Sequence, residues 1–166
     1  MLGIEMFKTQ FAYNAWASER VFGQAALVSL EQFNEPSVVG DHSLRQILFH
    51  MVEIERVWRL LAQEGQVEPS QLPSSESLPS AESMQAFQTQ ERQHMDVYLA
   101  HLQEADLAAQ LTIKRWDCVE LDVIRWHMLS HLLIHSMQHR SEAAVLLTQY
   151  GRSPGDIDFL FFTFAN

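Results

Sequence analysis

Four long stretches of the chain place apolar residues three or four positions apart, which is the spacing of one face of an α-helix. In the first stretch this rhythm is carried by Phe7, Phe11, Val21 and Phe22. The pattern predicts an all-α fold with four long helices. The predicted helices cover residues 4–30, 43–63, 81–103 and 122–150.

Turn-forming residues separate the first two predicted helices. Pro36 and Gly40 mark a loop between them. Ser43 and Gln46 have the spacing of a capping box, in which each side chain accepts a hydrogen bond from the other residue's backbone N–H. Gly65 follows the second helix, and a glycine just past the last turn is typical of a helix C-terminus. These signals set the expected start and end of the second helix.

Two further segments connect the later helices. Residues 69–80 (PSQLPSSESLPS) contain three prolines, which exclude regular structure there. The segment is long for a loop between antiparallel neighbours, so it predicts a crossover between helices two and three of a four-helix bundle. Residues 111–123 alternate β-forming residues with polar ones and predict an extended segment or a short hairpin. The whole chain, residues 1–166, is expected to form one domain.

The C-terminal tail is unusually aromatic. Residues 153–166 contain Phe159, Phe161, Phe162 and Phe164. Aromatic side chains of this size bury a large apolar area when they pack, so the tail is expected to lie against another surface.

The negative charge of the chain argues against nucleic acids and anionic membranes as partners. The 166 residues carry 21 acidic and 11 basic side chains, a formal net charge of −10, and no run of Lys and Arg. Nucleic-acid backbones and anionic membranes are bound mainly through Lys and Arg, so neither is an expected partner. The chain also lacks a stretch of about 18 apolar residues of the kind that spans a membrane.

Two features bear on the compartment. Cys118 is the single cysteine and cannot form an intrachain disulfide, which fits a reducing environment. The first residues (MLGIEMFKTQF) lack the basic region and following apolar run of a secretory leader. We therefore expect a cytoplasmic protein.

Four histidines recur at four-residue intervals in the last predicted helix: His127, His131, His135 and His139. Four residues make just over one helical turn, so neighbouring members lie stacked along one face. At about 100° of rotation per residue, His135 is expected near the middle of the core-facing stripe, with His131 and His139 about 40° to either side. His50, in the second helix, is expected to face the core as well.

Buried imidazoles need polar partners, because each ring carries a nitrogen that must be satisfied. Ordinary hydrogen bonds are one solution. A divalent metal shared by an i, i+4 pair and a third histidine is the other, and it satisfies three rings together. Competing sites have weaker signals. Only Glu91 and His94 have the Glu-x-x-His spacing of dimetal bundles, and the zinc-protease motif, paired cysteines and phosphate loops are absent. A haem held by two histidines has no positive signal.

Three blocks of the chain resemble a known family. Residues 135–142 (HSMQHRSE), followed by Leu146, Leu147 and Gly151, resemble the C-terminal motif of the DinB-like (DNA-damage-inducible) metalloproteins. Residues 11–17 (FAYNAWA) and residues 43–50 (SLRQILFH), the latter block ending in Trp58, resemble the two other blocks of that family and occur in the same order.

The resemblance implies an up-down-down-up four-helix bundle, often dimeric, with a divalent metal on three histidines. Carried over to this sequence, the ligands are His50, His135 and His139, which are also the residues that helix geometry selects. His127 and His131 then become neighbours of the site, in contact with its ligands, or plain core residues. The related maleylpyruvate isomerases and low-molecular-weight-thiol S-transferases depend on thiols, whereas many members have no known activity. Imidazole donors suit several metals, and we expect zinc or nickel.

One position departs from the family pattern. The family has Gly and Gln after its His-Arg pair, where this chain has Ser141 and Glu142. Glu142 lies three residues beyond His139 on the same helix face as His135. It is therefore a candidate catalytic residue, as a fourth metal ligand or a general base, and the alternative is a hydrogen bond to a histidine or to Arg140.

Three functions remain open at this point. A three-histidine site keeps an open coordination position, which suits a thiol transferase or a hydrolase. A metal that only secures the core would make a non-catalytic, structural bundle. A nucleic-acid role is suggested only by the family's label and conflicts with the acidic balance. The aromatic tail, Trp16 in the first helix and the family resemblance together predict a homodimer.

Overall fold

The computed structural model describes residues 3–37, 41–114 and 119–165; Cys118 lies outside these ranges. The part described is mostly helical, which confirms the all-α class, with one small hairpin added. The helices are α1 Gly3–Ala25, α2 Leu30–Asn34, α3 Leu44–Glu64, α4 Ala81–His101, α5 Arg125–Gln149 and α6 Phe159–Ala165, with the 3₁₀ turns η1 Pro69–Gln71 and η2 Glu104–Ala108. The strands are β1 Gln110–Lys114 and β2 Glu120–Ile124. Within the described residues no helix is long and apolar enough to cross a membrane.

The predicted ends of α3 are confirmed. The Ser43 N–H donates to Gln46 Oε1 over 2.8 Å, and the Gln46 N–H donates to Ser43 Oγ over 3.2 Å, which completes the capping box. At the other end Gly65 adopts a left-handed φ of 76° and its N–H donates to the Leu61 carbonyl. Glycine reaches this conformation without the strain that a Cβ would bring.

The first predicted helix was too long. The helix α1 ends at Ala25, and a separate short helix, α2, follows it. Ser29 caps α2 through a second capping box with Gln32. This Ser-x-x-Gln pair has the same spacing as the pair at α3, but it lies inside a stretch whose apolar rhythm continues without a Gly or Pro break.

The hairpin reading of the segment before α5 is confirmed. Strands β1 and β2 pair antiparallel, with Ile113 opposite Leu121. The Lys114 N–H donates to the Gly65 carbonyl over 2.8 Å, so the hairpin is tied to the end of α3. Its second strand runs to Ile124, and α5 therefore starts at Arg125 rather than at residue 122.

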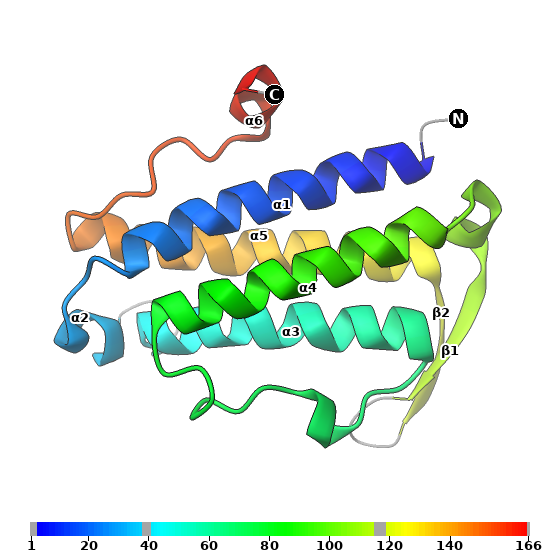
Figure 1. Ribbon diagram of the computed structural model, residues 1–166, viewed down its shortest axis with the longest axis horizontal. Coiled ribbons are helices and arrows are strands. Elements are labelled where there is room, and N and C mark those ends of the chain that lie inside the picture. Colours follow the sequence, from blue (N-terminus) through cyan, green and yellow to red (C-terminus); the bar gives the residue numbers. More distant parts are fainter. Residues whose placement is uncertain (1–2, 38–40, 115–118, 166) are drawn as a thin grey trace.

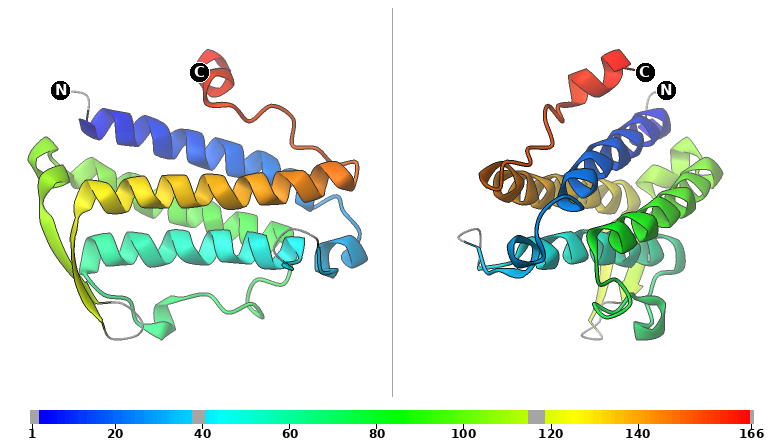
Figure 2. Two further views of the ribbon diagram at one scale, coloured as in Figure 1. Left: turned by 180° about the vertical axis from the view of Figure 1, so that it is seen from behind. Right: turned by 60° about the vertical axis from the view of Figure 1, so that its left-hand side comes forward.

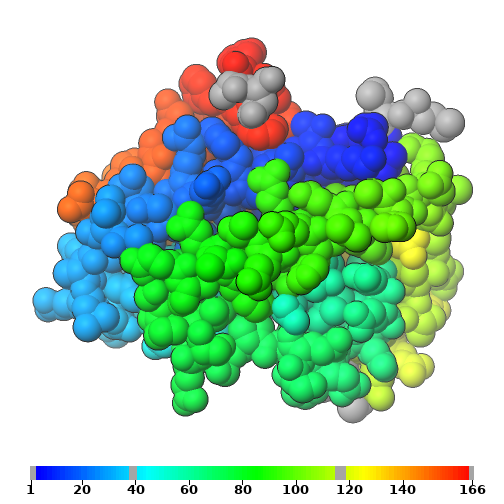
Figure 3. All heavy atoms as spheres, viewed as in Figure 1, coloured from blue at the N-terminus to red at the C-terminus, as the bar shows by residue number. Residues whose placement is uncertain are grey.

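The four long helices lie alongside one another in the arrangement of Figure 1, with α1 and α3 each packed against both α4 and α5. Figure 2 shows α5 beside α3 from behind, with the hairpin closing one end. The space-filling view in Figure 3 shows side chains of α1 and α4 covering the front face.

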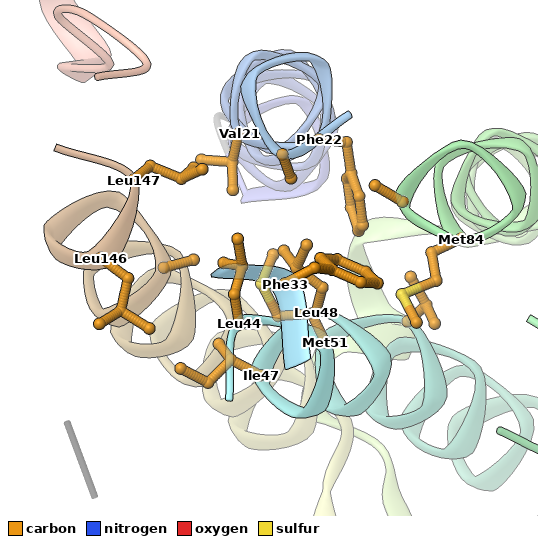
Figure 4. Close-up of a cluster of buried hydrophobic side chains, with 14 of the residues drawn as sticks. Val21, Phe22, Phe33, Leu44, Ile47, Leu48, Met51, Met84, Leu146 and Leu147 are labelled. Atoms are coloured by element: carbon orange, nitrogen blue, oxygen red, sulfur yellow. The ribbon is translucent and has the colours of Figure 1, made fainter. Parts of the chain in front are cut away.

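The apolar core consists of two clusters, one towards each end of the helices. Figure 4 shows the first, where Phe22 of α1, Phe33 of α2, Leu48 and Met51 of α3 and Met84 of α4 converge. The second cluster lies nearer the hairpin and contains buried residues of α1, α3, α4 and α5. Its largest members include Phe7, Phe11, Leu61, Tyr98, Leu99, Ile113, Leu129 and Leu132.

A network of polar side chains joins all four long helices inside the molecule. Arg140 of α5 is only 2% exposed and its Nη1 donates to Asn14 Oδ1 on α1. Asn14 in turn donates to Glu55 Oε1 on α3 over 2.7 Å. Gln88 of α4 and Ser136 of α5 lie 3.4 Å from the same carboxylate. Burial raises the pKa of Glu55 above its usual value, although these hydrogen bonds and the charge of Arg140 act in the opposite direction.

The tail lies over α1, as Figure 1 shows for α6. The Tyr13 hydroxyl donates to the Ile157 carbonyl over 2.8 Å, and the Phe162 ring lies 5.7 Å from the Trp16 ring. Phe161 and Phe164 are 49% and 79% exposed. The tail therefore packs on the protein through only part of its aromatic surface.

The network gives a stability prediction. Asn14→Ala removes the group that bridges Arg140 and Glu55, so we expect a loss of about 2 to 3 kcal/mol in the free energy of unfolding. Urea denaturation followed by circular dichroism measures it. Ser18→Ala is the control. The Ser18 hydroxyl forms only a long contact of 3.5 Å with Arg140 Nη1, so its removal should cost less than about 1 kcal/mol. Equal losses in the two variants would contradict this account of the network.

Candidate metal centre

The structure brings together the three predicted ligands. His50 comes from the middle of α3, and His135 and His139 come from successive turns of α5, the neighbouring helix in Figure 2. One nitrogen of each ring lies within 4.8 Å of the others, and all three side chains are half-buried. The centre of the His139 ring lies 4.7 Å from the centre of the His50 ring and 4.5 Å from that of the His135 ring.

The distance between two of the nitrogens fits a shared ion. His50 Nε2 and His135 Nε2 are 3.1 Å apart. Two imidazole nitrogens on one tetrahedral zinc, each about 2.0–2.1 Å from it, are separated by roughly 3.3 Å. The same distance also suits one hydrogen bond between the rings. Either way, the backbone already holds the two nitrogens about as far apart as a metal requires.

His139 shows the clearest sign of a missing partner. Its Nδ1 lies 2.6 Å from Glu142 Oε2, one turn further along α5. Its Nε2 is buried and forms no hydrogen bond with any residue in the described part of the chain. With Nδ1–H donating to the carboxylate, Nε2 carries a lone pair, which is the tautomer that binds a metal.

The surroundings keep two of the rings neutral. Burial and the neighbouring imidazoles of His139, His50 and His131 lower the pKa of His135 to about 4. Burial and the charge of His139 also lower the pKa of His50. For Glu142, burial acts to raise the pKa, but the hydrogen bonds from His139 and Gln138 outweigh it and the net shift is downwards. At neutral pH His50 and His135 are therefore uncharged imidazole donors, with one carboxylate close by.

Two of the three histidines border an open space. A cavity of about 460 Å³ is lined by His50 and His139 together with His42, Arg45, Glu53 and Ser75. Its walls come from α3 and the residue His42 just before it, from α5, and from the connection that precedes α4. A small molecule entering this cavity would meet the histidine cluster directly.

The other two histidines of the series do not join the cluster. His131 is exposed, and its ring stacks on His135 with a centre-to-centre distance of 5.4 Å. His127 is exposed and lies against Trp126, 4.0 Å between ring centres. His131 is a neighbour of the site, as the resemblance implied, but neither histidine is a core residue, because both side chains are exposed.

The predicted position of His135 was wrong. It is half-buried at the edge of the core face, which is centred on Leu132, Ser136 and Ala143. At 100° per residue, His135 lies about 80° from that centre and His139 about 40°. The reason is that Ser136 and Arg140 are buried polar residues, which a count of apolar positions does not place inside. His50 is likewise half-buried, on the side of α3 that faces α5.

The alternative dimetal motif has a different role. Glu91 is 3% exposed and binds Arg56 and Arg59 of α3 at 2.7 and 2.8 Å. His94 contacts the same carboxylate at 3.2 Å. Because two guanidinium groups bind the Glu91 carboxylate, Glu91 and His94 belong to an ion-pair cluster centred on this buried carboxylate.

Sequence reasoning missed the cavity wall. Arg45 belongs to the block that carries His50, and His42 lies just before it, but Arg45 is held at the cavity wall by Ser75 of the connection before α4. Glu53 follows His50 by one helical turn, and this spacing is the one signal that could have placed it beside the site.

A helical protein with a cluster of three histidines able to hold a metal ion is the class that this fold and site define. The model of the DinB family matches residues 5–166, nearly the whole chain. The chain therefore belongs to the DinB family. No curated protein matches the sequence significantly.

The contact between Glu142 and His139 predicts a measurable effect. Glu142→Gln keeps the shape of the side chain but removes the charge that favours the Nδ1–H tautomer of His139. We expect metal affinity to fall by roughly 10- to 100-fold, with the same stoichiometry. Competition with a chelating dye measures the affinity. Glu53→Gln, on the same cavity, is the control and should change the affinity much less. Unchanged affinity in Glu142→Gln would contradict the proposed role.

Proposed function

We propose that this protein binds one divalent transition metal through His50, His135 and His139 and is a metal-dependent enzyme of the thiol-transferase or hydrolase kind. The observation that carries the proposal is the buried Nε2 of His139, which has no hydrogen-bond partner among the described residues and lies near the Nε2 atoms of His50 and His135, themselves 3.1 Å apart. His50 and His139 also line a cavity. Zinc or nickel is the metal we propose, because imidazole donors suit both.

The proposed topology is the up-down-down-up bundle with a long crossover. In Figure 1, α3 and α4 both begin at the end of the bundle where α2 lies, and residues 65–80 return along its side between them. This arrangement leaves the crossover beside α3, where Ser75 contributes to the cavity wall.

When bound, such an ion supplies Lewis acidity at neutral pH. The residues of the chain supply the rest of the site. His50 and His135 remain neutral because burial lowers their pKa, so the full charge of the ion is kept. Glu142 fixes the ring of His139, and we propose it as the positioning carboxylate of the metal centre. The cavity admits a small molecule to the open side.

A non-catalytic metal-binding or structural bundle is the alternative function. A structural site is closed by protein ligands on all sides. The cavity of about 460 Å³ beside His50 and His139 instead favours an ion that a small molecule can reach. This observation supports the enzyme over the structural bundle.

Elemental analysis of tag-free protein tests the metal proposal. We expect about one equivalent of zinc or nickel in the wild type, and loss of most of it in His50→Ala and in His135→Ala, because two imidazoles hold an ion far less tightly than three. His127→Ala is the matched control from the same helix and should keep its metal. A well-folded wild-type protein that takes up neither metal would contradict the proposal.

We also propose that the protein is a homodimer. Ile134 and Met137 on the outer face of α5 are 63% and 52% exposed, beside a groove that Tyr13 and Phe159 also line. Large exposed apolar surfaces mark interaction sites. The groove and the unpacked aromatic side chains of α6 belong to one chain, so a second copy can cover both in a two-fold arrangement.

Sedimentation at micromolar concentration checks the dimer. Ile134→Glu places a charge in the proposed interface, so we expect the wild type to sediment as a dimer and this variant as a monomer. Val97→Glu, at a residue of α4 that is 58% exposed, is the control and should remain dimeric. A wild-type mass of one chain would overturn the proposal.

A further inference from the structure

Arg45 lies on the wall of the cavity that also exposes His50 and His139. It precedes His50 by five residues on α3, or about 7.5 Å along the helix axis. Its Nη2 donates to the Ser75 carbonyl over 2.8 Å. This bond holds the guanidinium between α3 and the connection before α4, at one end of the cavity.

The guanidinium keeps its charge available. Arg45 forms no ion pair with any residue that the structure describes, whereas Arg56, Arg59 and Arg125 each lie within 4.0 Å of a carboxylate. Arg20, Arg140 and Arg152 also form no ion pair among the described residues, so Arg45 is distinguished by its place on the cavity wall. Arg45 is also the one Lys or Arg among the described residues that line this cavity.

The two ends of the cavity along α3 carry residues of opposite charge. Glu53 lines it on the other side of His50, about 12 Å from Arg45 along the helix axis. Glu53 forms no ion pair with any described residue, and burial raises its pKa. An anionic group would therefore be drawn to the Arg45 end and repelled from the Glu53 end.

The donors at the Arg45 end suit a carboxylate better than a phosphate. Phosphate sites gather several free backbone N–H groups, often at a helix N-terminus. Here the capping box already uses the N–H groups of Ser43 and Gln46, which bond to each other's side chains. The charged donor on this wall is one planar guanidinium, whose fork matches a carboxylate.

We propose that Arg45 is a carboxylate-binding subsite, which selects small thiols that carry a carboxylate at the end opposite their sulfur. This inference rests on the proposed thiol chemistry at the three histidines. Arg45 holds the carboxylate, so the sulfur is directed towards His50, His135 and His139. A neutral thiol of equal size lacks this second attachment.

The test compares 3-mercaptopropionate with 3-mercaptopropionamide, two thiols of the same shape that differ in charge. Binding to cobalt-loaded protein is followed by the sulfur-to-cobalt charge-transfer band. In zinc-loaded protein, the Arg45 Nε–H signal is followed by ¹⁵N NMR. We expect the acid to bind about tenfold more tightly than the amide and to be alone in shifting the Arg45 signal.

Arg45→Gln should remove most of the tenfold preference without loss of cobalt, and Arg45→Lys should keep part of it. Arg20→Gln, which removes a positive charge from α1, is the matched control and should keep the full preference.

Equal binding of both thiols in the wild type, with a cobalt band and a fixed Arg45 signal, would overturn the subsite but not the proposed function. A shift of the Arg45 signal without any cobalt band would overturn the thiol chemistry and keep the carboxylate site. If neither the cobalt band nor the Arg45 shift appeared, both the subsite and the thiol chemistry would be overturned.

Discussion

The buried guanidinium of Arg140 sets the rotation of α5, and the position of the metal centre depends on it. Arg140 is 2% exposed and bonds to Asn14 on α1, and Asn14 bonds to Glu55 on α3. A charged group buried this deeply is tolerated only with such partners, so α5 cannot turn about its axis without breaking them. His139 is the residue before Arg140, and this rotation points its ring towards α3.

The same network orients α3. Glu55 follows His50 by five residues, so anchoring its carboxylate at the centre of the bundle fixes the direction of the His50 side chain. Two helices held by one set of hydrogen bonds therefore present their histidines to each other. The protein's own hydrogen bonds therefore hold the three side chains together, which lowers the ordering cost of binding an ion.

The sequence predicted those features that depend on local chemistry. The caps of α3 follow from Ser43, Gln46 and Gly65, because a capping box and a left-handed glycine need only their own helix. The ligand set follows from the i, i+4 spacing of His135 and His139 and from the family motif. Their neighbourhood in space is confirmed.

The remaining features depend on long-range packing, which a single-sequence pattern does not contain. The core face of α5 was misplaced because Ser136 and Arg140 are polar yet buried, and hydrogen bonds from other helices decide that. Arg45 reaches the cavity wall only because Ser75, thirty positions later, accepts its hydrogen bond. The break between α1 and α2 was missed because apolar residues continue through it.

X-ray absorption spectroscopy of the zinc-loaded protein tests the central claim, that three histidines share one ion with an open position, most directly. We expect three imidazole ligands at about 2.0–2.1 Å with characteristic outer-shell scattering, and one further light-atom ligand. Addition of 3-mercaptopropionate should replace that ligand with sulfur at about 2.3 Å. Fewer than three imidazoles in the first spectrum would contradict the account.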